Sequence, residues 1–280
     1  MSLIRDELDN ILALLEWCEE KQDKVSFLEL FLRIQDFLGV FGLLDLRVTW
    51  GEYAIQAAKA LGCLRDLGRL YAIAMGWAAI KRGELDRASE WLDEGLRIIK
   101  ASNDQELECA VLRLLGRLRN AQGQSKEALR IYQSALTMAR ARGSASVVAG
   151  LNSDLAYWEM RHGTPEEAER YIRESIAEFE DLDDSVRVHD RSIMLANILV
   201  HQGKSSEAEE WLLPNLASIE EGFGHREAVA HGYACLAHIR ASQGNVSEAK
   251  RYCADAREVY ERIGMQQETF PIGLPSICEE

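Results

Sequence analysis

Proline is scarce in this sequence, and long apolar runs are missing from it. Only four prolines occur among 280 residues, so long stretches are open to uninterrupted helices. No window offers the roughly 18 consecutive apolar residues that a membrane-spanning helix needs, and we expect no transmembrane segment. The first residues carry charges such as Arg5 and Asp6 where a signal peptide has its apolar core. We therefore expect a cytoplasmic protein.

Basic charge is also in short supply. Lysine and arginine total 32 against 46 aspartate and glutamate residues, which gives a formal net charge of −14. A protein that binds duplex nucleic acid needs a basic surface to neutralise phosphates, and an anionic membrane surface makes the same demand. We expect neither nucleic acid nor a membrane as a direct partner. The hydrophobic fraction of 47% is large enough for a folded core.

Motifs for chemistry are absent as well. The six cysteines form no CxxC pair and no zinc-like spacing, and we read them as reduced, mostly buried thiols. No GxxxxGK[ST], GxSxG, HExxH or GxGxxG occurs. His231, Cys235 and His238 share helical spacings, but His231 and His238 stand two turns apart and Cys235 suits a buried face. We expect no catalytic residue, no cofactor and no metal; an enzyme with an unrecognised site is the less favoured alternative.

What the sequence does have is an internal repeat. A glycine followed five residues later by an alanine recurs at steps of 40, 40, 40 and 41 residues, by subtraction of the glycine numbers. An earlier, degenerate copy begins at Gly42 and has Arg47 in place of the alanine. The five matched segments are Gly83–Ala88, Gly123–Ala128, Gly163–Ala168, Gly203–Ala208 and Gly244–Ala249.

The residues around each glycine predict a helix, a tight turn and a second helix. Seven residues before it stands a small residue, which lets two helices approach closely. The glycine ends the first helix because it adopts the left-handed conformation without steric cost. Apolar residues four and eleven positions after the alanine then mark one face of the second helix. The small residues are Gly76, Gly116, Ala156, Ala196 and Ala237.

This unit resembles the tetratricopeptide repeat, and the resemblance covers roughly residues 24–263. It implies an all-α, right-handed solenoid of about six helix pairs of about 40 residues each. We expect one repeat domain over residues 1–263, in which residues 1–22 form a capping helix and the turn glycines are those at 42, 83, 123, 163, 203 and 244. Residues 264–280, with Pro271 and Pro275, are predicted to be a non-helical tail. A partial cap on the last pair is the favoured interpretation, and a loose tail is the alternative.

The segment Leu8–Trp17, LDNILALLEW, carries a second resemblance. It is similar to the segment that opens the repeat region of bacterial signal-transduction NTPases of the NB-ARC/STAND type. In that family a nucleotide-driven switch is joined to a repeat sensor and an effector, often a transcription regulator. The match is partial, because Ile11, Leu12 and Leu14 depart from the family pattern, and the switch motif itself is absent. The resemblance implies a covalent link to a nucleotide-binding domain in a longer native chain.

In the tetratricopeptide family the first helix of each pair lines a concave wall. Counting back from each turn glycine places a basic and aromatic strip on that wall. Arginine forks bind carboxylates and phosphates through paired hydrogen bonds, so an acidic or C-terminal peptide is one expected ligand. The alternative is that these arginines pair with neighbouring glutamates. The candidate residues are Trp77, Lys81, Arg113, Arg117, Asn120, Tyr157, Arg161, Asn197, His201 and His238.

These observations favour a protein- or peptide-binding sensor or scaffold over an enzyme. The first hypothesis is the ligand-sensing part of a bacterial signal-transduction ATPase or transcription regulator. The alternative is a stand-alone cytoplasmic adaptor or peptide receptor.

Overall fold

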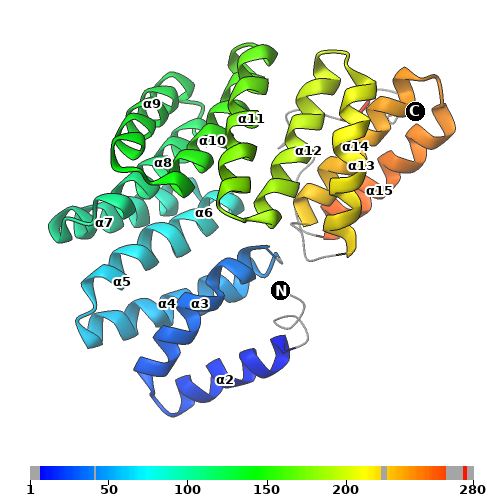
Figure 1. Ribbon diagram of the computed structural model, residues 1–280. Coiled ribbons are helices and arrows are strands. Elements are labelled where there is room, and N and C mark those ends of the chain that lie inside the picture. The colour runs from blue at the N-terminus through cyan, green and yellow to red at the C-terminus, as the bar shows by residue number, and fades with distance from the viewer. Residues whose placement is uncertain (1–6, 41, 222–225, 263–273, 276–280) are drawn as a thin grey trace. The chain divides into compact units, whose positions relative to one another are not determined.

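The computed structural model describes residues 7–40, 42–221, 226–262 and 274–275, and every regular element among them is a helix (Figure 1). The residues divide into two compact units, Met1–Val147 and Val148–Glu280, with the border inside one helix. Each unit is described by itself, and the single domain expected over residues 1–263 stays a prediction. No helix within the described ranges is long and apolar enough to cross a membrane.

The first unit contains a single helix, three helix pairs and the start of a further helix. Its elements are α2 (Leu8–Glu20), α3 (Lys24–Val40), α4 (Leu44–Leu61), α5 (Leu64–Arg69), the π-helical η1 (Leu70–Gly76), α6 (Trp77–Arg82), α7 (Leu85–Ser102), α8 (Gln105–Ala121), α9 (Ser125–Arg142) and the start of α10 (Ala145–His162). α5, η1 and α6 together form the first helix of the second pair, with α7 as its partner.

The second unit continues the same plan. It holds the rest of α10, then α11 (Pro165–Asp181), α12 (Ser185–His201), α13 (Ser205–Glu221), α14 (Arg226–Ser242) and α15 (Val246–Arg262). α12 packs on its partner α13, on α11 of the preceding pair and on α14 of the following pair. This is the position of a first helix between two neighbouring pairs. The described residues of both units thus form six helix pairs, and the predicted all-α, tetratricopeptide-like solenoid class is confirmed.

Left-handed residues end the first helices at five of the six predicted turns. Gly42, Gly83, Gly123, Gly203 and Gly244 have φ values of 72°, 74°, 77°, 75° and 76°. The expectation is wrong at Gly163, whose φ is not positive. Pro165 restricts the residue before it to an extended conformation, and Thr164 accordingly lies at φ −121° and ψ 143° and caps α11 through its hydroxyl.

A second set of left-handed residues lies between successive pairs, and the sequence pattern did not reveal it. Its members have φ values between 54° and 71° and recur about every 40 residues, although three of them are not glycine. They are Gln22, Gly62, Asn103, Gly143 and Asp183.

Small residues hold the two helices of each pair close together, as predicted. A Cβ atom at Gly76 would lie 2.7 Å from the Leu92 side chain, and one at Gly116 would lie 2.4 Å from the Tyr132 ring. The equivalent Ala156, Ala196 and Ala237 are fully buried. At the contact between α7 and η1 the added atom would meet backbone, because a Cβ at Gly95 would lie 2.9 Å from the backbone nitrogen of Ala72.

We expect Gly95→Ala to lower the free energy of unfolding by about 1–2 kcal/mol, although alanine favours helix. The added methyl group meets backbone, which cannot rotate away as a side chain can. Urea unfolding followed by circular dichroism measures the change. Gly123→Ala tests a different cost, because its Cβ would meet no atom within 4 Å and only the left-handed φ is strained. A Gly95→Ala protein as stable as the wild type would contradict the packing described here.

Arg47, the residue that replaces the repeat alanine, is buried and ties the first pair to the second. Its side chain is 3% exposed and donates to three carbonyl oxygens: Gln35 at 2.8 Å, Ile73 at 3.0 Å and Ala74 at 3.1 Å. The last two carbonyls belong to η1, and a side chain that inserts among helix carbonyls is a recognised cause of local widening. Burial lowers the pKa of Arg47 to about 10 against the opposing effect of Asp36, so the guanidinium is charged at neutral pH.

Ion pairs join the second helix of one pair to the first helix of the next. Arg82 Nη1 lies 2.7 Å from Asp45 Oδ1 in the first unit, and Arg240 Nη2 lies 2.6 Å from Glu209 Oε1 in the second. The glutamate of the latter pair has its pKa lowered, chiefly by the hydrogen bond from Arg240. Asp45 and Glu209, both on second helices, are therefore already paired.

The cysteines and the tail depart in part from expectation. Cys18, Cys63, Cys109 and Cys235 are free thiols, but Cys253 is disulfide-bonded, so the prediction of six reduced thiols is wrong. In the tail, Leu274 is non-helical and packs against Tyr260 and its neighbours on α14 and α15. The rest of the predicted cover, within residues 263–273 and 276–280, lies outside the described residues.

Candidate functional site

Trp77 and Lys81 lie on α6, the end of the first helix in the second pair. Trp77 is half-buried between the cores of two successive pairs. The guanidinium of Arg47 lies 4.5 Å from the centre of its ring, and the exposed ammonium of Lys81 lies 5.9 Å from it. Gly39 leaves room for this stack, because a Cβ there would come within 3.0 Å of the indole. The ring is thus held rigidly, partly as core and partly as surface.

Arg113, Arg117 and Asn120 lie on α8, one pair further along. All three are half-buried, and Arg113 and Arg117 each already interact with a neighbouring group. Asn120 differs, because its Oδ1 atom is buried and accepts no hydrogen bond from any described residue. An unsatisfied buried acceptor costs about 1–3 kcal/mol, so a donor that reached it would be bound favourably.

A small hollow of about 310 Å³ lies where α5, α8 and α10 begin. Asp104 forms one wall: it caps α8 through the Leu107 N–H at 3.1 Å and pairs with Arg65 at 2.7 Å. Burial raises the pKa of Asp104, but these two bonds outweigh it and hold the pKa below its ordinary value. The hollow is lined by Arg65, Asp66, Arg69, Asp104, Glu106, Leu107, Ala110 and Val147.

Arg69 is the residue in this hollow that the sequence analysis missed. It is half-buried, and its guanidinium makes no hydrogen bond or ion pair with the residues that the structure describes. A signal was available, since Arg69 lies eight residues, or about two helical turns, before the candidate Trp77. Arg69 adds an unpaired cation to the first helices of the first unit.

The five candidates of the second unit differ in exposure. Arg161 Nη1 donates to Tyr157 Oη at 3.3 Å, and its guanidinium lies 5.9 Å from the ring centre. His201 is exposed and His238 is half-buried. Asn197 is 7% exposed and donates to the Ile193 carbonyl of its own helix at 3.0 Å, which makes it the least open of the five to a ligand.

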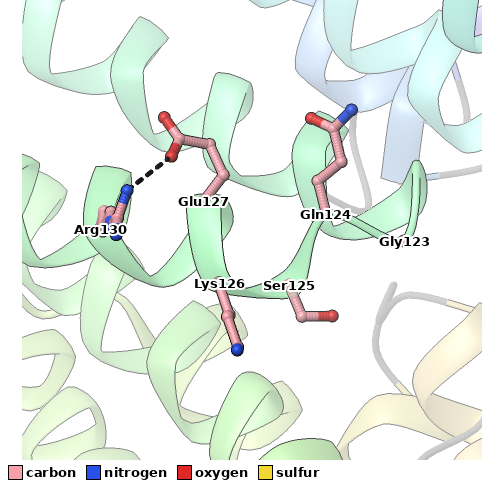
Figure 2. A pocket seen from close by; sticks show the side chains of 6 residues that line it. All are labelled: Gly123, Gln124, Ser125, Lys126, Glu127 and Arg130. Carbon is pink, nitrogen blue, oxygen red and sulfur yellow. Dashed lines mark ion pairs between the residues drawn. The ribbon is translucent and has the colours of Figure 1, made fainter.

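A second hollow, of about 600 Å³, is not a convincing site. Figure 2 shows that its lining comes from one turn and the start of α9, from Gly123 to Arg130. Glu127 and Arg130 form an ion pair at 3.7 Å on the exposed helix surface. Side chains of a second element do not close it, so it is an open surface beside a helix end.

Ligands for a metal ion are not gathered anywhere in the described part of the chain. In the His231–Cys235–His238 group that the sequence suggested, Cys235 is fully buried in an apolar cluster, and burial raises its pKa. A thiol in this state is a poor ligand, since metals bind the thiolate.

Comparison with known proteins agrees with the repeat architecture. Residues 69–141 match the tetratricopeptide repeat family. The chain is a tetratricopeptide-like repeat protein. Over 100 residues it is 32% identical to the transcription activator GutR of Bacillus subtilis (strain 168), a match that takes in 36% of this chain and only 12% of GutR.

Two solved structures extend the comparison. The Rap conjugation gene regulator of plasmid pLS20, solved with the Phr* peptide, has a TM-score of 0.67 at 16% identity over 91% of this chain and 79% of that one. A signal transduction ATPase with numerous domains (STAND) from Pyrococcus horikoshii, which has a tetratricopeptide repeat sensor, has a TM-score of 0.63 at 13% identity over 92% of this chain and 41% of that one. Identities this low show a shared fold.

Proposed function

We propose that this chain binds a protein or peptide through the first helices of its pairs and acts as a sensor or scaffold rather than as an enzyme. The observation that carries the proposal is the grouping of cationic and aromatic side chains on α5, α6 and α8, with Arg69 unpaired, in a chain of net charge −14. The solved Rap regulator holds the Phr* peptide on a similar fold, which supports a peptide as the ligand.

The chemistry of this surface favours an acidic ligand. Guanidinium groups bind carboxylates in paired hydrogen bonds, and Trp77 offers a rigid apolar face beside them. Arg113 and Arg117 already have neighbours, so a ligand carboxylate would join or displace an existing interaction there. At Arg69 a ligand carboxylate would displace no hydrogen bond or ion pair of the described residues. In the first unit, the five candidate residues and Arg69 constitute the proposed binding surface, and the five candidates of the second unit are proposed to contact a ligand within that unit.

A panel of fluorescein-labelled seven-residue peptides tests the proposal. Peptides rich in aspartate and glutamate, with and without a free C-terminal carboxylate, are compared with lysine-rich peptides of the same apolar content by fluorescence anisotropy. We expect saturable binding of acidic members that weakens as salt rises, because the ion pairs are partly exposed. Equal binding of both sets, or of neither, would count against an acidic peptide.

We further propose that the native system is regulatory, with this chain as the ligand-sensing part of a signal-transduction ATPase or transcription regulator. The Leu8–Trp17 segment, the partial match to GutR and the fold of the STAND sensor support it. An immunoblot of native cells gives the test. A band much larger than 31.6 kDa fits a sensor joined to a switch, whereas a band at that mass favours the stand-alone cytoplasmic adaptor.

A further inference from the structure

α2 occupies the place of a second helix in a repeat pair. It ends at Gln22, whose φ of 56° matches the left-handed residues that end the second helices α4, α7, α9 and α11. It packs against α3, as a second helix packs against the next first helix, and buries Leu15 and Cys18 there. Figure 1 shows α2 as the outermost helix of the first unit. The described residues contain no first helix beside it.

The face of α2 that a first helix would cover is apolar and open. Leu14 lies eight residues before Gln22 and is 48% exposed; Trp17 lies five residues before it and is 50% exposed. The position eight residues before each equivalent turn is buried in the four pairs whose following turn has a described left-handed residue. Its occupants are Ala54, Gly95, Ala135 and Ser175.

Contacts in complete pairs show what covers this position. Gly95 of α7 approaches Ala72 of η1 so closely that a Cβ would lie 2.8 Å from the alanine methyl. Ser175 of α11 donates through its hydroxyl to the Ala149 carbonyl of α10 at 2.8 Å. In both cases the neighbour is the first helix of the same pair. The exposed face of α2 therefore corresponds to the face that a packed helix covers in complete pairs.

The charges around that face favour a partner helix with basic side chains. Residues 7–21 include five acidic side chains and one basic side chain, Lys21. Glu16 and Glu20 are exposed beside Trp17. A second copy of α2 would bring the same acidic edges together, which is unfavourable, whereas lysine or arginine would complement them. An exposed tryptophan is also the side chain that most often dominates the energy of an interface.

We propose that α2 is a docking site for an amphipathic partner helix with an apolar stripe and lysine or arginine flanks, which packs on the exposed face of α2 with Leu14 and Trp17 as its anchors. This surface is separate from the proposed peptide surface on α5, α6 and α8. Because the anchors are half-exposed, replacing them removes the docking site and leaves the core residues Leu15 and Cys18 in place.

The test uses the full chain and a labelled synthetic helix of about 18 residues, or five turns, with a leucine and alanine stripe flanked by lysines. Fluorescence anisotropy measures its affinity for the wild type and for Leu14→Ala/Trp17→Ala. We expect this double variant to bind about 10- to 100-fold more weakly. The matched control is Leu182→Ala/Leu213→Ala, which removes two leucines of similar exposure elsewhere and is expected to bind as the wild type does.

Three outcomes would overturn the proposal. One is equal binding by wild type and the α2 variant. Another is equal binding of a helix with glutamate in place of lysine. The third is a dimer, seen by light scattering, that the α2 variant abolishes, since the occupant would then be a second copy. Binding of the acidic peptide panel should be the same in the α2 variant, which separates this surface from the proposed function.

Discussion

Replacing Arg47 with alanine should lower the free energy of unfolding of the first unit by about 3–4 kcal/mol, the largest stability effect that the structure implies. Three carbonyl oxygens, those of Gln35, Ile73 and Ala74, lose their donor at once. The Trp77 ring loses the cation that lies 4.5 Å from its centre. A void opens beside Gly39, which is kept small to accommodate both side chains.

Lysine at this position should recover only part of the loss. A single ammonium group retains the charge but cannot reproduce a planar fork that reaches carbonyls on two elements. We expect Arg47→Lys to cost about 2 kcal/mol. Urea unfolding followed by tryptophan fluorescence suits the experiment, because Trp17, Trp50, Trp77 and Trp91 all lie in the first unit.

The control for Arg47 is Arg130→Ala. The Arg130 side chain is 81% exposed, and its one ion pair among the described residues is with Glu127 on its own helix. Its removal should change the free energy of unfolding by less than about 0.5 kcal/mol. If Arg47→Ala were equally mild, the buried guanidinium would not be what joins the first two pairs.

Charge reversal on α8 is the second large effect that we expect. Arg113→Glu/Arg117→Glu should weaken the best acidic peptide of the panel about 100-fold, because two attractive contacts become repulsive. Binding is measured by anisotropy at low salt and repeated at high salt, where the difference should shrink.

Both arginines already interact with neighbours, so a second variant guards against a folding defect. Arg69→Glu changes a side chain that is unpaired among the described residues, and it should weaken the same peptide about tenfold with an unchanged melting temperature. Lys126→Glu, on the exposed start of α9, reverses a charge away from the first helices and should have no effect. Normal affinity in both test variants would place the binding surface elsewhere.

The repeat could be predicted from the sequence because each of its features has a local physical cause. Glycine is needed for the left-handed turn at Gly83, and a small residue is needed where Gly116 meets Tyr132. Gly163 shows the limit of this logic, since the proline two residues later imposes a different turn on the same motif. Asn103 and Asp183 adopt the left-handed conformation without being glycine, so a search for glycine could not find them.

The candidate site was less predictable, because its features depend on contacts between distant residues. Arg47 stood out in the repeat alignment as a misplaced charge, yet only its bonds to Ile73 and Ala74 reveal a structural role. Trp77 was placed on the inner face by counting, and the structure adds that its ring is fixed by that arginine. Arg69 became a candidate because its guanidinium has no hydrogen bond or ion pair among the described residues, and residue spacing alone does not show this.

The most direct test of the account asks which helices touch the ligand. A benzophenone amino acid is placed at Ile80, on the first helix α6, and in a second protein at Gln133, on the exposed side of the second helix α9. Each protein is irradiated with the best acidic peptide, and cross-linked product is measured by mass spectrometry. The account predicts cross-linking from position 80 and none from position 133. Cross-linking from position 133, with none from position 80, would contradict a binding surface formed by the first helices.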